Sequence, residues 1–458
     1  MPGRIDFTMG FNAQNAAYKI DSDTSYRIYI LGSFSGESGL AWQQRNIKKI
    51  DIDNIEQVMG EFLPTLTISS ELKLSFKTMD DFHPDIWLEK VKLLAELQQL
   101  KKQVSNPQSA AQAAAKIQAY FPTQAPNDRP EPVQQTTESQ DDMLERLLGK
   151  KPESTHATSD SLAGFIDQIV SPYVTKDADP EHLDLINLID ASLSQILQSL
   201  LHRSDFQHLE ALWKATAALV NEESADEQSI FLVDISQAEL LAELKNDSHA
   251  FKQKLLKHVQ LNEGEQDVLL ISNYCFADTT EHRALLNYCS RLANTVGGYF
   301  LGAADDSFIA NLGYSEPNNV QTLTQYLNEI NADRVVLAYP RYLIRLPYGK
   351  KVDPIDTFEF EECSAIPQSD ELLWGSSAFL CARVLIKNST TADAFLFSDI
   401  PAFTFAQDGE SILQPGVETV LTEKQANALL SLGISPVIGF RQRQGVRVLS
   451  IAMLSGSQ

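Results

Sequence analysis

Hydrophobic and polar residues alternate in blocks along residues 334–375. An apolar run, Val335–Ala338, is rich in strand-forming residues and ends before a proline, which removes a backbone donor. A second apolar run, Tyr342–Leu346, is closed by a proline and a glycine, both turn formers. An acid-bearing polar segment then leads to Trp374, where an apolar, helix-like run begins. The pattern predicts a buried strand, a long loop and an aromatic anchor.

The N-terminal part of the chain predicts a small α+β unit over residues 26–103, preceded by a polar, loosely held arm at residues 1–25. Asp53 is the expected N-cap of its first helix, because Glu56 follows at the capping-box spacing. The predicted elements are a strand at Tyr26–Leu31, a short strand at Ile47–Ile52, a helix from Asp53 to about Phe62, a hairpin formed by Leu66–Ile68 and Leu72–Phe76, and a helix from Asp80 to about Lys102.

Residues 104–160 predict a linker, because prolines are spread among Gln, Ser, Thr and Ala. Within it, residues 141–151 can form about two helical turns with one apolar stripe. The stripe consists of Met143, Leu144, Leu147 and Leu148. An isolated helix of this length is marginal in water, so it needs a surface to lie on. We interpret the stripe either as a partner-binding face or as a linker helix that folds back on its own domain.

The C-terminal part, residues 161–458, predicts a layered α/β unit with a mixed sheet, because strands and helices alternate along it. The fold class expected for the whole chain is therefore α/β. The predicted elements are helices over most of residues 161–225, one of them starting at Asp179 and the next capped by Ser204, a strand at Ile230–Ile235, a helix from Ser236 to Lys245, a strand at Val268–Ser272, a helix at Glu281–Val296, a strand at Tyr299–Leu301, a helix at Gly375–Lys387, a helix capped by Thr422 and ended by Gly433, and two strands flanking residues 441–445.

Composition narrows the choice of partners. The 458 residues suffice for two or three domains of about 150 residues each, and the formal net charge is −24. So negative a chain argues against nucleic acid and anionic membrane surfaces as partners. There is no apolar run of about eighteen residues and no apolar signal-peptide core. The four cysteines form no CxxC pair, so we expect a cytoplasmic protein with reduced thiols.

Catalytic and cofactor-binding motifs do not emerge from the sequence. There is no phosphate-binding GxxxxGK[ST] loop, no HExxH or CxxC metal spacing and no GxSxG elbow. Glu359 and Glu361 would point to one face of a strand, which favours a solvated edge or a subunit contact over an acid–base pair. We therefore expect no enzyme activity, no cofactor and no metal site, and an α/β enzyme is the less favoured alternative.

Two groups of residues are expected to matter for structure and assembly. Arg341 and Arg345 lie four residues apart beside apolar positions and should pair either with the acidic loop or with another subunit. Five further residues are expected to act as structural anchors because they are aromatic or fix a turn. These anchors are Trp213, Pro347, Tyr348, Gly349 and Trp374.

Short motifs carry a resemblance to a known family. In the C-terminal unit DFQHLEALW, RLPYG, FEFEE and LLWG follow one another as in the large subunit of the contractile sheath of bacterial type VI secretion systems. In the N-terminal unit ILGSFSG, KKIDIDNIEQVM and TMDDFHPD resemble the sheath small subunit, with Ile55 where that family usually has Phe. This second resemblance covers roughly residues 15–103.

The resemblance implies a fused small-plus-large sheath subunit, both parts shortened, whose two units pair as the family's separate subunits do. It implies a structural, non-catalytic component of a phage-tail-like contractile sheath, or an assembly protein associated with it. The alternative is a regulator or adaptor that binds sheath subunits, or the sheath-recycling unfoldase, without joining the lattice. The expected partners are other sheath subunits, with an AAA+ unfoldase and further copies of the chain as additional candidates.

Overall fold

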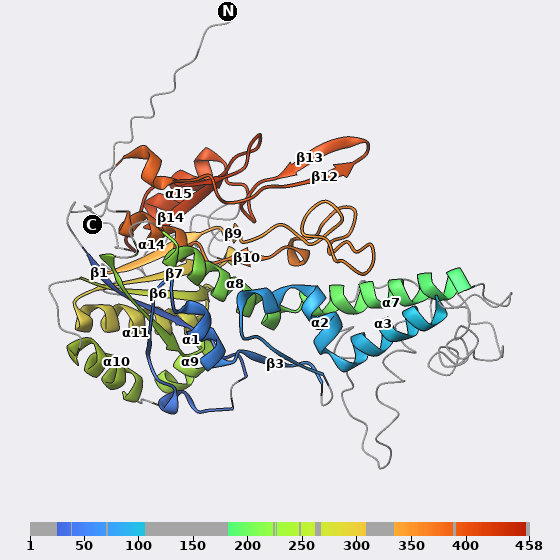
Figure 1. The fold of residues 1–458 in the computed structure, drawn as a ribbon. Coiled ribbons are helices and arrows are strands. Elements are labelled where there is room, and N and C mark those ends of the chain that lie inside the picture. Colours follow the sequence, from blue (N-terminus) through green and yellow to red (C-terminus); the bar gives the residue numbers. More distant parts are fainter. Residues whose placement is uncertain are drawn as a thin grey trace, which may run out of the picture.

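A mixed nine-stranded sheet organises the part of the chain that the computed structural model describes, residues 25–37, 39–69, 72–105, 182–222, 225, 227–246, 249–261, 267–307, 334–387 and 391–454. The strand order is β11-β15-β14-β8-β7-β6-β1-β5-β2. In chain order the strands are β1 Tyr26–Gly32, β2 Lys48–Ile50, β5 Ser229–Asp234, β6 Asp267–Phe276, β7 Tyr299–Ala304, β8 Val335–Tyr339, β11 Leu396–Phe397, β14 Ile434–Gly439 and β15 Val446–Val448. Together with the surrounding helices, this sheet confirms the expected α/β class (Figure 1).

Strand β1 comes from the N-terminal segment but lies inside the sheet of the C-terminal segment. It pairs in parallel with β5 on one side, where Ile28 lies opposite Ile230. On the other side it pairs in parallel with β6, where Ile28 lies opposite Leu269. All seven residues of β1 are buried. The prediction that the two resembling units fold against each other is therefore confirmed.

Helices cover both faces of the sheet, because successive side chains of a strand point to opposite faces. Ile28 and Ile30 of β1 belong to one apolar core, packed under α8 (Ser204–Val220) and α14 (Ala378–Ile386). Tyr29 and Leu31 belong to the other core, covered by the helices that follow β5 and β6 and by the helix that precedes β14. Those helices are α9 Gln237–Lys245, α10 Ala250–Leu261, α11 Thr280–Val296 and α15 Glu423–Ser431.

A helical arm extends from the sheet (Figure 1). It consists of α2 (Pro84–Lys90), α3 (Lys92–Val104) and α7 (His182–Leu201), with the hairpin β3–β4 and helix α1 near its base. Leu94 of α3 and Ile189 of α7 are fully buried in the shared apolar core. The bounds of the remaining elements are η1 Trp42–Gln44, α1 Ile55–Phe62, β3 Thr65–Thr67, β4 Lys73–Ser75, η2 Met79–Phe82, β9 Tyr342–Leu343, η5 Ser369–Glu371, β10 Trp374–Gly375, η6 Ala392–Phe395, β12 Phe403–Gln407 and β13 Glu410–Gln414.

Several helix ends differ from the sequence-based expectation. Helix α1 begins at Ile55 rather than after Asp53, because the Asp51 carboxylate accepts the backbone N–H groups of Asp53 and Asn54 and holds them in a turn. Ser204 is the first residue of α8 and not its cap. By contrast, Ser236 and Thr422 form the expected caps, each in a capping box with a residue three positions later.

Three further expectations from the sequence were wrong. The single helix expected from Asp80 to Lys102 is three pieces, because Pro84 starts α2 and Val91 has extended dihedral angles between α2 and α3. The acidic segment at 353–362 contains no named strand in the part of the chain described, so Glu359 and Glu361 do not share the face of a strand. Helix α14 begins at Ala378, three residues later than expected.

The position of β1 predicts that the chain survives cleavage in its linker. A cut between Pro122 and Pro132 should leave two fragments that elute together in gel filtration at micromolar concentration, because β1 stays paired on both sides. The matched control carries Ile30→Pro, which removes a donor from the middle of β1 and should release the fragments. Clean separation of the unmodified fragments would contradict the prediction.

Candidate functional site

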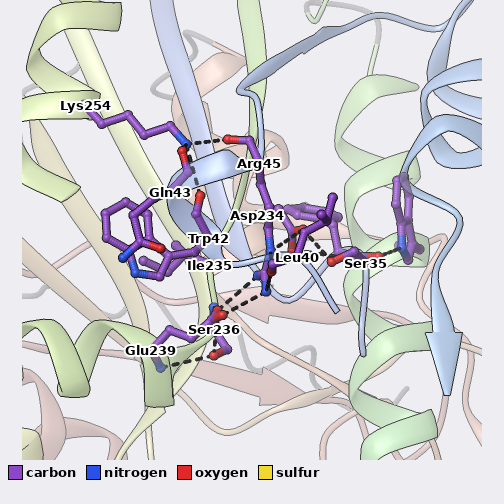
Figure 2. A network of polar contacts seen from close by, with 12 residues as sticks. Ser35, Leu40, Trp42, Gln43, Arg45, Asp234, Ile235, Ser236, Glu239 and Lys254 are labelled. Atoms are coloured by element: carbon purple, nitrogen blue, oxygen red, sulfur yellow. Dashed lines mark hydrogen bonds and ion pairs between the residues drawn. The ribbon is translucent and has the colours of Figure 1, made fainter. Parts of the chain in front are cut away.

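A buried polar cluster joins the N-terminal and C-terminal segments at the carboxyl ends of β1 and β5 (Figure 2). We call Ser35, Arg45, Asp234, Glu239 and Lys254 the Asp234 cluster. Asp234 is the last residue of β5, and Ser35 follows β1 by three residues. The Ser35 backbone N–H donates to Oδ1 of Asp234 at 3.2 Å, and its hydroxyl donates to Oδ2 at 2.5 Å. One carboxylate therefore fixes the turn that leaves β1.

Arg45 extends the cluster to helix α9. Its Nε lies 3.6 Å from Oδ2 of Asp234, and its Nη1 and Nη2 donate to the two carboxylate oxygens of Glu239 at 3.1 and 2.8 Å. The same guanidinium donates to the carbonyl oxygen of Leu40. Glu239 also caps α9 by accepting the backbone N–H of Ser236. The arginine of the N-terminal segment thus ties its own loop to the start of a helix in the C-terminal segment.

Lys254 on α10 approaches the same loop from the other side (Figure 2). Its Nζ donates to the carbonyl oxygens of Trp42 and Gln43, both at 3.1 Å, and to that of Arg45. These carbonyls belong to η1 and its end, where the Trp42 carbonyl oxygen also accepts the backbone N–H of Arg45. Burial, followed by the nearby charge of Arg45, lowers the pKa of Lys254.

The Asp234 cluster leaves no room for a small molecule. Burial raises the pKa of Asp234 above its ordinary value, although the Ser35 hydroxyl and Arg45 act in the opposite direction. The space enclosed near Trp42, Asp234 and Lys254 is about 10 Å³. A single water needs roughly that volume or more. The contacts of the cluster therefore attach one segment to the other.

A second buried cluster, the Arg345 cluster, lies near the base of the arm. Arg345 Nε is 2.7 Å from Oε1 of Glu210 on α8, and its Nη1 is 2.7 Å from Oε2 of Glu362. The side chains of Glu210 and Glu362 are 0% and 2% exposed. The guanidinium also lies 4.1 Å from the ring centroid of Tyr348, whose backbone N–H donates to Glu362. Burial alone would lower the pKa of Arg345, but the two carboxylates outweigh it and raise that pKa.

The loop that follows Arg345 is held on the arm. Lys101 of α3 bonds to the carboxylate of Asp190 on α7 at 2.8 Å and to the carbonyl oxygen of Thr357 at 3.3 Å. Its Nζ also lies 5.4 Å from the ring centroid of Phe358. Gln98 adds a bond to the Thr357 hydroxyl at 3.1 Å. One lysine therefore connects two helices of the arm to the acidic loop.

The N-terminal and C-terminal segments each match a known protein family. Residues 184–452 match the family model VipB, described as EvpB/VC_A0108, tail sheath N-terminal domain. Residues 2–121 match the family model T6SS_VipA, described as type VI secretion system, VipA, VC_A0107 or Hcp2. The chain belongs to the type VI secretion tail sheath family. Its resemblance to fused small and large sheath units is thereby confirmed.

A relative of this sheath-family chain is the type VI secretion system sheath protein TssC1 of Pseudomonas aeruginosa. The two are 25% identical over 340 residues, which cover 67% of this chain and 68% of the relative. A structural sheath component is thus supported from both parts of the chain. In the described part of this sheath protein, no helix has the length and apolar character needed to cross a membrane.

The structure gives both arginines singled out in the sequence a partner within the chain. Arg345 takes the acidic loop through Glu362, one of the two alternatives considered. Its other partner, Glu210, was missed, although it lies in the DFQHLEALW motif. Arg341 forms a two-pronged pair with Glu418 at 2.7 and 2.6 Å. Contact of either arginine with another subunit stays a prediction.

The remaining predicted residues lie as follows. Met143, Leu144, Leu147 and Leu148 fall outside the described residues. Trp213 is 0% exposed, and its Nε1 donates to the carbonyl oxygen of Phe34 at 3.0 Å, which joins the two segments. Trp374 packs against Leu343 and Leu372, and its Nε1 donates to the carbonyl oxygen of Ser369 at 2.7 Å.

The turn at residues 347–349 was also expected to act as a structural anchor. Pro347, Tyr348 and Gly349 are all buried. A Cβ on Gly349 would lie 2.3 Å from a carboxylate oxygen of Glu361, so a larger residue there would displace that side chain. The Glu361 carboxylate also accepts the backbone N–H of Lys350, while Glu359 pairs with the Lys350 side chain. The two glutamates therefore bind different groups of the same residue, Lys350.

The raised pKa of Asp234 predicts a pH-dependent stability. A group whose folded pKa lies above its unfolded value stabilises the fold at low pH and loses that contribution as the pH rises. Asn does not ionise, so the Asp234→Asn variant does not undergo this loss. The unfolding free energy of the variant, minus that of the parent, should therefore increase as the pH rises above about 4. Urea unfolding at several pH values measures the difference. Parallel pH profiles for the two proteins would contradict the prediction.

The Arg345 cluster predicts an asymmetric response to substitution. Arg345→Met leaves Glu362 buried without its counter-charge and leaves Glu210 only the more distant Lys214 at 3.8 Å, which should cost about 3–5 kcal/mol of unfolding free energy. Replacing all three residues by Met and Gln should recover most of that loss, because no buried charge remains. Lys350→Met, at an exposed pair, is the control and should change little. Urea unfolding checks all three, and equal losses in the single and triple variants would rule this account out.

Proposed function

We propose that this chain is a single-chain building unit of a type VI secretion sheath, in which the small- and large-subunit parts are covalently joined. The observation that carries the proposal is the position of β1. It belongs to the segment that matches the small-subunit family, yet it pairs with β5 and β6 of the segment that matches the large-subunit family. The Asp234 cluster and the Trp213–Phe34 bond support the same joint.

In this proposal the chain divides into an arm at residues 1–25, a small-subunit-like unit at 26–103, a linker at 104–160 and a large-subunit-like unit at 161–458. Covalent linkage makes the encounter of the two units intramolecular, with an effective concentration set by the length and stiffness of the linker. It also fixes their ratio at one to one. The proposed location is the cytoplasm, and the proposed partners are other sheath subunits.

The proposed role is structural. Sheath proteins act through contacts with each other, and the buried charged groups of both clusters are engaged in holding segments together. The alternative role is that of an adaptor or regulator, which binds sheath subunits or the sheath-recycling AAA+ unfoldase without entering the lattice. Residues 141–151 are the proposed recognition helix in that case.

Electron microscopy separates these roles. The purified full chain is mixed with sheath small and large subunits during their assembly, and the tubes are collected by sedimentation and imaged. We expect the chain to sediment with the tubes and to be distributed along their length in the images, because it carries equivalents of both the small and the large subunit. An Ile30→Pro chain, whose β1 is disrupted, is the control and should remain in the supernatant. Tubes that form normally and exclude the unmodified chain would overturn a building-unit role.

A further inference from the structure

A turn between β14 and β15 carries isolated positive charge on a strongly negative chain. We call residues 440–445 the arginine turn. Arg441 and Arg443 are exposed, and no ion pair to either is found within the described ranges. The guanidinium of Arg443 lies 4.0 Å from the ring centroid of the half-buried Phe440. The chain as a whole has a net charge of −24. On so negative a chain, the turn is therefore suited to bind an acidic surface of a second copy.

The acidic loop offers a shaped surface of opposite charge. We call the groove lined by Lys350 and residues 354–360 the acidic groove, and its volume is about 260 Å³. Its apolar lining residues are Ile355, Phe358 and Phe360, which are 6%, 9% and 2% exposed. Asp356 and Glu359 carry exposed carboxylates at the same groove. An apolar floor with carboxylates at its rim suits a cationic side chain with an apolar stem.

The groove has a fixed shape before any partner arrives. Lys101 and Gln98 hold Thr357 on α3, and the Arg345 cluster fixes the residue that ends the loop, Glu362. Lys350 neutralises part of the charge through its 2.7 Å pair with Glu359, but both side chains are exposed, and such pairs exchange partners at little cost. A surface that is already ordered loses little conformational entropy on binding.

The two surfaces lie on different parts of the molecule. The arginine turn lies against the chain after β11, where Gln444 bonds to the carbonyl oxygen of Ser398 and Gly445 to that of Ile400. The acidic groove lies on the arm, which extends away from the sheet that contains β14 and β15 (Figure 1). A contact between them therefore joins separate molecules.

We propose that the arginine turn of one copy docks in the acidic groove of a second copy of this chain. Charge complementarity selects the pair, and the stacked Phe440–Arg443 unit matches the apolar floor of the groove. Because the two surfaces differ, the contact is heterologous, and each added copy leaves one free turn and one free groove. The contact thus builds open chains of copies. It deepens the building-unit role and rests on it.

Charge reversal tests the contact. Self-association of the full chain is measured by sedimentation velocity at about 0.05 M and about 0.5 M salt. We expect concentration-dependent oligomers at low salt that dissociate at high salt, because exposed charges are screened. The variants R441E/R443E and D356K/E359K should each associate about tenfold or more weakly, because like charges then face each other.

Mixing the two variants is the decisive arm. At one junction the acidic turn of R441E/R443E meets the basic groove of D356K/E359K. At the next junction the unchanged turn of D356K/E359K meets the unchanged groove of R441E/R443E, so association should return. The control is K73E/K424E, which changes the net charge by as much as R441E/R443E does, at two exposed lysines elsewhere, and should associate like the parent. Recovery in the mixture also shows that both variants are folded.

Three results would overturn the proposal. These are a parent chain that stays monomeric at low salt, an R441E/R443E chain that associates normally, and a mixture that does not recover. A parent chain that associates with sheath subunits but never with a second copy of itself has the same meaning as a parent chain that stays monomeric. The result is separable from the building-unit role, because a chain that enters sheath tubes without self-associating defeats only the contact between turn and groove.

Discussion

The structure depends on one strand that pairs on one side with residues 202 positions further along the chain and on the other side with residues 241 positions further along, as Arg27 opposite Ser229 and Tyr26 opposite Asp267 show. Six residues of β1 pair with β5, and six pair with β6. Without β1, strands β5 and β2 would be detached from the other six strands of the described sheet. Both apolar cores would also lose their central row, since Ile28 and Ile30 serve one face while Tyr29 and Leu31 serve the other. The N-terminal segment is thus part of the central sheet of this sheath-family chain.

The two polar clusters add specificity to that apolar joint. Buried ion pairs contribute little net stability, because desolvation of each charge offsets most of the attraction. What they do is penalise any other arrangement of the same segments. If β1 shifted its register by two residues, Asp234 at the end of β5 would lose both hydrogen bonds from Ser35. The Arg345 cluster acts likewise on the acidic loop, because only one position of that loop brings Glu362 and Glu210 to one guanidinium.

Much of the local structure follows from the sequence, and little of the long-range pairing does. The strand at Tyr26–Leu31 and the caps at Ser236 and Thr422 were predictable, because alternation, apolar runs and capping residues act over a few positions. Nothing local identifies the neighbours of β1, since an apolar run fits any buried position in a parallel sheet. The resemblance to two subunits supplied the pairing of the units, and the structure supplied the register.

The candidate site shows the same division. Arg345 stood out because a charged residue between apolar runs needs a partner, and the acidic loop was a plausible source. Glu210 did not stand out, because a glutamate on a helix is normally solvated, and only the packing of α8 under the sheet makes it 0% exposed. The same limit explains why the start of α1 was predicted wrongly. Asp51 and Asp53 are two positions apart, and only the structure shows that the Asp51 carboxylate accepts the backbone N–H groups of this turn.

The position of β1 has a consequence for how the chain is made. Ribosomes add roughly 5–20 residues each second. From the end of β1 at Gly32 to the start of β5 at Ser229, synthesis therefore takes on the order of 10–40 s. Throughout that interval the most apolar strand of the N-terminal segment has neither of its sheet neighbours, and its two open edges can pair with other nascent chains. In a fused sheath subunit the two parts do not have to find each other as separate chains, but the first strand stays unpaired for a long part of translation. Chaperone protection of that strand matters most during this time.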